Sequence, residues 1–497
     1  MLALVSLPTL LAGASEIPFS IAAQYHFQGG AGLSGNTNLP TAKQVAALPS
    51  SAAFRGLVLD AAAAALADEV SLENRSAGKT VFSALLSEFW QTESMGSFVP
   101  AQSNALRFVL AVHLDDAQSW RDRLARVFGG PGEAFTVGGF GGWRWGGVGT
   151  NLTPFSLVPA KDWLVVELGD DLKSLQEEDL LQIARQGRPA PVLAKDLLQA
   201  DLDLGQLRPW LPPALLLLKP ARVHLTVSAK SDRFDIAAHL AYGEPISWTP
   251  QPWQIPTELV RSPLISFTAG NDLAAMLDLD ASFLGFEHNP LTNQLYAWAL
   301  REVTFQSYMA WPVTNAANAL QDLSTEAPQA LNADLKRIDG GELHWLPDEE
   351  RLVLSKLGLV VPALEAAPAK SGQFLLLSLF PISFNANPAP QELWKQLQGR
   401  SNLVYYDWEA TGPRLQQWRL LSQMLLYPPM GRNAERLDAT VIKENWLNGI
   451  GFIKGDAVTE LTRVAPNELA LVRNAPLGLT GLEWVLFSDW ISRAKPQ

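Results

Sequence analysis

The sequence contains no cysteine. Disulfide bonds, thiol nucleophiles, thiolate metal ligands and a lipid-anchored cysteine are therefore excluded. Basic residues are also scarce, since 38 lysines and arginines against 50 acidic residues give a formal charge of −12. No lysine- or arginine-rich run occurs. Because nucleic acids and anionic membranes are bound through clustered cations, we expect neither of them as a partner.

Long apolar runs and signature motifs are missing as well. After the N-terminus, no segment approaches the roughly 18 uninterrupted apolar residues that cross a bilayer, and the run at 213–218 is far too short. The sequence has no HExxH motif, EF-hand loop or dinucleotide-binding glycine pattern. We therefore expect no transmembrane span and no cofactor.

The first 14 residues resemble an export signal. Residues 2–11 (LALVSLPTLL) form an apolar run of signal-peptide length, and residues 12–14 (AGA) match a small-x-small cleavage site. The basic region that normally precedes such a run is missing, because the first lysine or arginine is Lys43. A start site placed too far downstream would explain that gap, and a buried first helix or strand is the alternative. We expect a signal peptide over 1–14 and a periplasmic or secreted protein.

A chain of 497 residues is too long for one ordinary core and predicts two or three domains. Prolines 245, 250, 252 and 256 cannot continue a ladder or a helix, so the main boundary falls among them. Trp248 and Trp253 indicate that this linker packs against protein. We expect a lead-in and helical segment over 15–100, a first domain over 101–245, a linker over 246–258 and a second domain, or two repeat modules, over 259–497.

One local pattern recurs near residues 106, 263 and 402. Each time an alternating strand leads through a polar capping residue into helical spacing. Asp115 or Asp116 can cap the first of these helices, Asn271 the second and Thr411 the third. We interpret the three segments as a divergent tandem repeat. The predicted fold class is α+β, with tandem antiparallel-sheet modules, helices packed on one face and a helical N-terminal segment.

The glycine cluster at 138–147 (GGFGGWRWGG) is the least ordinary segment. As a strand it places Trp143 and Trp145 on one face and Arg144 on the other. Two coplanar indoles can stack on a sugar ring or another apolar ligand, and the glycines would let that ligand approach the backbone. These three residues are the candidate ligand-binding residues. The alternative, a bent strand with core tryptophans, is favoured because tryptophan is usually buried.

Residues 222–242 read as a hairpin whose turn is at 231–232. The register that pairs Val227 with Ile236 also sets His224 opposite His239 on the polar face, with Asp235 on the same face. Cross-strand histidines about 5 Å apart could share a metal ion. No obvious third ligand accompanies them, so a half-exposed polar face is the favoured interpretation.

Residues 400–409 (RSNLVYYDWE) and 261–268 (RSPLISFT) share a local pattern. On these segments the chain resembles a family of uncharacterised exported proteins from Verrucomicrobia-type bacteria. The resemblance covers most of residues 100–490 and implies export and an α+β fold. That family carries no assigned activity, so none is implied for this chain. The missing basic region at the N-terminus departs from an intact export signal.

Two classes of function remain. The first is a non-catalytic exported envelope protein that binds a protein partner or an apolar or glycan ligand, because open sheet faces and edges suit binding. The second is a hydrolase whose site is built from dispersed aspartate, glutamate and histidine residues. A deep cleft with convergent carboxylates would favour the hydrolase, and smooth sheet faces with an apolar groove would favour binding.

Overall fold

The structure is a computed structural model of the chain. It describes residues 21–69, 75–100, 106–148, 153–169, 173–189, 196–211, 218–276, 293–301, 306–337, 340–357, 360–380, 387–426 and 434–493. The expected signal peptide over 1–14 lies outside these residues.

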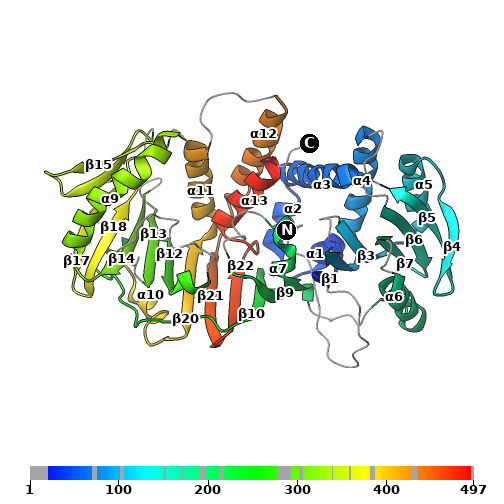
Figure 1. Cartoon of the computed structure of the whole chain (residues 1–497), viewed down its shortest axis with the longest axis horizontal. Helices are drawn as coiled ribbons and strands as arrows, with labels where there is room; N and C mark the ends of the chain where they lie inside the picture. Colours follow the sequence, from blue (N-terminus) through cyan, green and yellow to red (C-terminus); the bar gives the residue numbers. More distant parts are fainter. Residues whose placement is uncertain are drawn as a thin grey trace.

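A single antiparallel sheet of 20 strands runs through the molecule. Successive pairings give the order β4-β5-β6-β7-β3-β2-β1-β8-β9-β10-β22-β21-β20-β12-β13-β14-β18-β17-β16-β15. The two ends of this sheet lie at opposite ends of an elongated molecule (Figure 1). The strands are β1 (Ala23–Phe27), β2 (Ser94–Pro100), β3 (Leu106–His113), β4 (Glu133–Val137), β5 (Phe140–Val148), β6 (Thr153–Ala160), β7 (Trp163–Leu168), β8 (Asp196–Asp203), β9 (Ala221–Lys230), β10 (Arg233–Tyr242), β12 (Leu264–Asn271), β13 (Gln294–Leu300), β14 (Ser307–Val313), β15 (Glu342–Leu346), β16 (Arg351–Ser355), β17 (Ala363–Ala369), β18 (Gly372–Ser378), β20 (Leu403–Ala410), β21 (Asp456–Ala465) and β22 (Glu468–Ala475), and β11 (Arg261–Ser262) pairs separately with β19 (Asn387–Pro388).

The order of the sheet reads the same from its centre toward either end. Strands β1–β10 form copy 1, and β12–β18 with β20–β22 form copy 2. In each copy the strands, numbered within that copy, follow the order 10-9-8-1-2-3-7-6-5-4 from the centre outward. The last strands of the two copies, β10 and β22, pair antiparallel from Phe234↔Ala475 to Ala241↔Glu468. The chain is therefore a tandem duplication arranged about a pseudo-two-fold axis at this central pair.

This duplication corrects the predicted repeat. The strands near residues 106, 263 and 402 are β3, β12 and β20, and they are the third strand of copy 1 and the first and eighth strands of copy 2. The three segments are therefore not equivalent to one another. The prediction was wrong because all alternating strands that lead into a capped helix have similar local sequence patterns. The place of each strand in the sheet is set by its pairing with distant strands.

Helices are inserted between the strands. Those in the described residues are α1 (Gly29–Gly35), α2 (Pro40–Ala46), α3 (Pro49–Glu69), α4 (Arg75–Gln91), α5 (Ala117–Phe128), α6 (Lys173–Gln186), α7 (Leu204–Leu207), α9 (Ala316–Arg337), α10 (Gln391–Lys395), α11 (Thr411–Leu426), α12 (Ala434–Gly449) and α13 (Gly481–Arg493), with short 3₁₀ turns η1 (Arg208–Trp210) and η2 (Leu273–Met276). The α+β class and the helical N-terminal segment are confirmed.

Most of these helices lie on one face of the sheet, here called the helix-rich face, but the prediction of a single covered face needs correction. In β3, Phe108 packs in a cluster with residues of α3, α4 and α5. The next residue along β3, Val109, points the other way and packs with Leu180 of α6. In copy 2, Phe267 likewise meets Trp394 of α10 at 5.5 Å between ring centroids. Strands buried on both sides need helices on both sides.

The helical insertions join the two copies. Helix α3 belongs to copy 1, yet it packs against α12 and α13 of copy 2. Phe54 of α3 stacks on Trp446 of α12 at 4.2 Å, and Trp446 Nε1 donates to Ser51 Oγ at 3.0 Å. These helices lie side by side near the middle of the molecule (Figure 1). In the described part of the chain, α3 is also the one helix long and apolar enough to span a membrane, by length and composition only.

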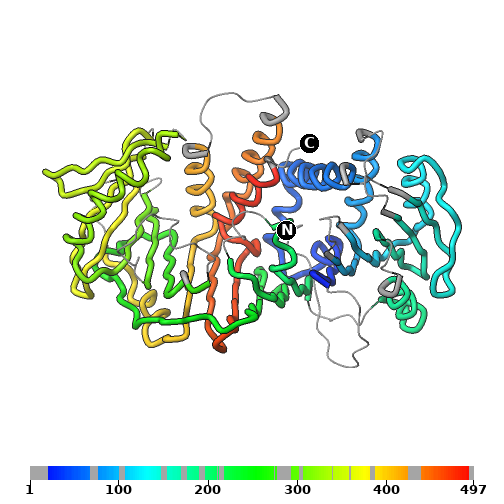
Figure 2. The backbone as a smooth tube through the Cα atoms, in the orientation of Figure 1, coloured from blue at the N-terminus to red at the C-terminus, as the bar shows by residue number. Residues whose placement is uncertain are grey.

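The predicted linker over 246–258 connects the last strand of copy 1 to copy 2, and Figure 2 shows this green segment running past β21 and β20. It is packed against protein. Trp248 Nε1 donates to the carbonyl of Pro466 and Trp253 Nε1 to that of Arg400, each at 3.2 Å. The sheet continues across the junction, so separate folding of the two predicted domains stays a prediction.

Candidate functional site

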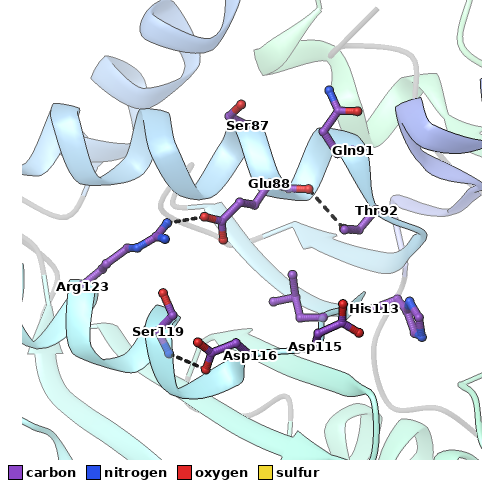
Figure 3. Close-up of a pocket in the computed structure, with 10 residues that line it drawn as sticks. Ser87, Glu88, Gln91, Thr92, His113, Asp115, Asp116, Ser119 and Arg123 are labelled. Atoms are coloured by element: carbon purple, nitrogen blue, oxygen red, sulfur yellow. Dashed lines mark hydrogen bonds and ion pairs between the residues drawn. The ribbon is translucent and has the colours of Figure 1, made fainter. Parts of the chain in front are cut away.

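A cavity of about 490 Å³ opens in copy 1 where α4 ends, β3 ends and α5 begins (Figure 3). Its position follows from local sequence. Helix α4 stops just before β2, while Asp115 and Asp116 turn the chain from β3 into α5. Nine of its ten lining residues have polar side chains, and the tenth is a leucine: Ser87, Glu88, Gln91, Thr92, His113, Leu114, Asp115, Asp116, Ser119 and Arg123.

Glu88 holds the two helices of this cavity together. One of its carboxylate oxygens accepts a hydrogen bond from Trp120 Nε1 at 2.8 Å. The other pairs with the guanidinium of Arg123 on α5 (Figure 3). The Glu88 carboxylate is therefore engaged on both oxygens, and its role is to fix α4 relative to α5.

Asp116 has a structural role too. Its carboxylate accepts a hydrogen bond from the Ser119 amide at 3.0 Å and caps α5, as one of the two predicted alternatives requires. Asp115 beside it is exposed at the cavity rim. With three carboxylates and one arginine, the lining carries two net negative charges when His113 is neutral.

His113 lies at the inner side of the cavity, at the end of β3. Its ring meets the edge of Trp163 at 5.2 Å between centroids. Glu93 is close by and accepts a hydrogen bond from His26 Nε2 at 2.8 Å, which lowers the pKa of Glu93. The cavity therefore offers polar donors and acceptors on rigid elements, of the kind that orient a hydroxylated ligand.

The sequence-predicted ligand residues lie elsewhere on β5. Trp145 is 5% exposed, packs against Phe128 and Phe155, and donates Nε1 to the carbonyl of Gly130 at 2.8 Å. Trp143 shares its face, as predicted, and lies 5.0 Å beneath the guanidinium of Arg121. Arg144 is opposite Glu133 of β4. The Trp145 ring is thus part of the core and has no open face for a ligand.

The predicted hairpin register is confirmed, with Val227 opposite Ile236 and His224 opposite His239. Each histidine has its own carboxylate. His224 Nδ1 lies 3.1 Å from Asp201 Oδ1, and His239 Nδ1 lies 3.1 Å from Glu468 Oε1. Among the residues that the structure describes, no group of three or more histidines and carboxylates could hold a metal ion. The pair belongs to a half-exposed polar face.

Copy 2 contains a cluster of buried charges that the sequence interpretation missed. Asp407 and Glu409 of β20 face α11 and α13 and are 7% and 3% exposed. Thr268 Oγ1 donates to Asp407 at 2.7 Å, and the amide of Gly481, the first residue of α13, donates to Glu409 at 2.7 Å. The alternation of Tyr405, Asp407 and Glu409 along one strand could have indicated this cluster. The sequence of this segment instead favoured the interpretation of a strand followed by a capped helix.

The arginines of this buried cluster have other partners. Arg473 of β22 forms a two-fold ion pair with Glu483 of α13, at 2.7 and 2.8 Å. Arg414 of α11 donates to Gln417, and its guanidinium lies 4.4 Å from the centroid of the Trp418 ring. Both arginines of the cluster are therefore bound to groups other than Glu409.

Burial sets the protonation of these groups. Burial, reinforced by the charge of Asp407, raises the pKa of Glu409 to about 8. Burial also raises the pKa of Asp407 and lowers the pKa of Arg414 to about 10. Groups with such shifts occur both at functional sites and in structural ion networks. The cavity of copy 1 is open to ligands, whereas this cluster lies under two helices, so the cavity is the better candidate site.

No protein-family model, curated protein or solved structure matches this chain.

Proposed function

We propose that this protein is a non-catalytic exported protein of the bacterial cell envelope, and that it binds a glycan in the cavity between α4, β3 and α5. The observation that carries this proposal is the lining itself. Hydroxyl, amide and carboxylate groups surround about 490 Å³, and two of the three carboxylates are committed to holding α4 and α5 in place. Sugars are recognised by such groups when rigid elements pre-orient them.

Asp115 and Gln91 are the side chains to test first. Both are exposed at the cavity and come from different segments, the turn after β3 and the end of α4. A ligand hydroxyl held by a carboxylate contributes about 1.5–3 kcal/mol, so Asp115→Ala should weaken binding by about tenfold or more. Gln91→Ala removes a neutral hydrogen bond and should weaken binding by about three- to tenfold.

The experiment is a screen of defined oligosaccharides by calorimetry, followed by titration of the best ligand into each variant. Glu133→Gln on the exposed β4 edge is the matched control, because it removes a carboxylate outside the cavity. The site is supported if the Asp115 and Gln91 variants lose affinity and the Glu133→Gln control does not. Full affinity in both variants would contradict it.

A hydrolase is the alternative, and one observation favours it: Glu88, Asp115, Asp116 and His113 share one cavity. Glycoside hydrolysis needs two carboxyl groups that are free to exchange protons or attack. The same oligosaccharides should therefore be incubated with the protein and assayed for new reducing ends. Turnover abolished by Asp115→Asn would replace binding with catalysis.

Export is the remaining part of the proposal. It is supported by the apolar start and the small-x-small site at residues 12–14, and by the resemblance to exported proteins of Verrucomicrobia-type bacteria. Expression of the full chain in a bacterial host followed by cell fractionation tests it. A mature N-terminus at Ser15 in the periplasm or medium is expected, and an uncleaved cytoplasmic protein would count against export.

A further inference from the structure

The N-terminal end of helix α13 rests on a buried carboxyl group. Glu409 accepts the amide hydrogen of Gly481, which begins α13, at 2.7 Å, and it is 3% exposed. The next contact is Glu483, which accepts from the Thr480 amide and pairs with Arg473 of β22. The start of the last helix is therefore fixed to the sheet by ionisable groups.

The surroundings of Glu409 suit its neutral form. Ser266 is its direct cross-strand neighbour, and Thr411 follows it on the chain. Both are buried, and neither hydroxyl has a hydrogen-bond partner among the described residues. A buried carboxylate is stable only with several donors or a paired cation. Here the flanking hydroxyls do not compensate a negative charge.

The charged groups around Glu409 come from every element packed on it. They are Asp407 and Tyr405 from its own strand β20, Arg414 from α11, Arg473 from β22 and Glu483 from α13. Asp407 and Glu483 repel a negative charge on Glu409, and Arg414 attracts one. Arg473 is neutralised by Glu483. The repulsion by Asp407 therefore adds to burial in favouring the proton.

We propose that α13 is a proton-dependent latch: the helix stays docked on the sheet while Glu409 carries a proton and loosens when Glu409 loses it. Once ionised, Glu409 is a buried charge under α13, and the simplest relief is for the start of α13 to lift so that water reaches the carboxylate. The C-terminal half of the helix remains held by Phe487, whose ring meets Phe54 of α3, and by Asp489, which pairs with Lys443 of α12 at 3.1 Å.

The direction of the pH effect follows from the proton. Folding raises the pKa of Glu409 from 4.5 to about 8, so the docked state binds the proton more tightly than the open state. Docking is therefore strongest below pH 4.5, weakens as the pH rises above it and loses this contribution once the pH passes 8. The latch opens in alkali and closes in acid.

Hydrogen exchange of the full chain between pH 6.5 and 9, followed by mass spectrometry and corrected for intrinsic rates, tests this proposal. Protection of the first turns of α13 should fall by about tenfold or more over that range. Helix α5 in copy 1 is the internal reference and should not change. Equal protection of α13 at both pH values would overturn the proposal.

Two variants separate the proton on Glu409 from helix docking in general. Glu409→Gln keeps an acceptor for Gly481 but cannot ionise, so α13 should stay protected at pH 9. Glu483→Gln weakens the ion pair with Arg473, so protection should drop at every pH while the change between pH 6.5 and 9 remains. A Glu409→Gln protein that loosens in alkali as the parent does would also overturn the proposal.

Discussion

Copy 1 and copy 2 differ in the polarity of their equivalent sheet faces. Counted from the hairpin turns, the strands of the two copies correspond residue by residue, and Gly205 and Gly412 then occupy equivalent positions just after the eighth strand. On the helix-rich face, one row of cross-strand neighbours in copy 1 is apolar. In copy 2 the matching row is polar and charged. These rows are Tyr25, Ala200, Leu225 and Ala238 in copy 1, and Thr268, Asp407, Thr459 and Arg473 in copy 2.

The opposite face shows the reverse. Copy 1 carries the polar row there, and copy 2 carries a mostly apolar one. The rows are Gln24, Asp201, His224 and His239 against Phe267, Trp408, Val458 and Asn474. In copy 2 this face packs with α10 and with Trp253 of the linker. In copy 1 the side chains of Asp201 and His224 are each 31% exposed.

The topology of the sheet and the polarity of its faces are therefore set separately. Strand alternation decides which residues share a face, and turn positions set the register. Neither alternation nor register decides whether a face is shielded from water. The helices that cover a face decide this, and they differ between the copies. In copy 1 the long helices α3 and α4 follow β1, whereas in copy 2 the long helices α11 and α12 follow β20.

The largest loss of stability is expected when a carboxylate equivalent to Glu409 of copy 2 is introduced into copy 1. Leu202 matches Glu409 and is 4% exposed in an apolar cluster. Leu202→Glu loses about 2 kcal/mol of apolar burial and buries an unpaired carboxyl group at about 3 kcal/mol, so unfolding should cost about 5 kcal/mol less at pH 7. Urea denaturation measures this loss.

The pH dependence of that variant is the sharper result. Burial raises the pKa of a carboxyl group, so the folded state binds its proton more tightly and the loss should shrink as the pH falls from 7 to 5. Leu202→Gln, of similar size but unable to ionise, is the control and should show the same loss at both pH values. A pH-independent loss in Leu202→Glu would mean that this face of copy 1 accommodates a charge.

The next effect concerns the junction between the copies. Phe54 of copy 1 stacks on Trp446 of copy 2 and is 5% exposed. Phe54→Ala should lower the free energy of unfolding by about 3–5 kcal/mol through the cavity that it leaves. Hydrogen exchange should show protection falling in both copies. Loss confined to copy 1 would mean that the helical insertions do not couple them.

Phe452→Ala provides the control, since Phe452 is 49% exposed. It removes the same number of atoms outside the interface and should change stability by less than about 1 kcal/mol.

A smaller loss of stability is expected when the ion pair between Arg473 and Glu483 in copy 2 is broken. Arg473→Met keeps most of the side-chain length and leaves Glu483 without its partner. Fully buried pairs cost about 3–5 kcal/mol to break, but the Glu483 side chain is 39% exposed, so we expect about 2 kcal/mol. Arg400→Met breaks the pair with Glu460, in which the arginine is 31% exposed against 11% for Arg473, and should cost less than about 1 kcal/mol. Equal losses would mean that burial does not distinguish the pairs.

Sequence reasoning could predict the fold class because alternation and capping are local. The sequence predicts the Val227–Ile236 register, and Asp116 is one of the two alternative caps that it predicts. The order of the sheet was not predictable, because β3 pairs with β7 and β12 with β20 across long intervening segments. The two-copy repeat depends on such pairings, so local similarity at residues 106, 263 and 402 predicted the wrong repeat.

The candidate site was harder still. Its cavity combines the end of α4 with the start of α5, and no motif joins Gln91 to Asp115. The sequence predicts Asp115 and Asp116 only as alternative caps, and Asp116 is the cap. Tryptophans drew attention to Trp143 and Trp145 because their chemistry is visible in sequence, whereas burial of the Trp145 ring by Phe128 and Phe155 is a product of the fold.

The smallest effect is expected on the exposed row of copy 1. His224 and Asp201 form a half-exposed pair, so His224→Ala should change the free energy of unfolding by less than about 1 kcal/mol. The same variant tests whether His224 and His239 share a metal ion despite their separate carboxylates. Added zinc should shift the melting temperature of the parent and of His224→Ala equally, because neither has a third ligand at the pair among the described residues. A zinc-dependent rise that the variant abolishes would show that this face gathers a metal site in solution, and the polar row of copy 1 would then have a function that the apolar row of copy 2 has lost.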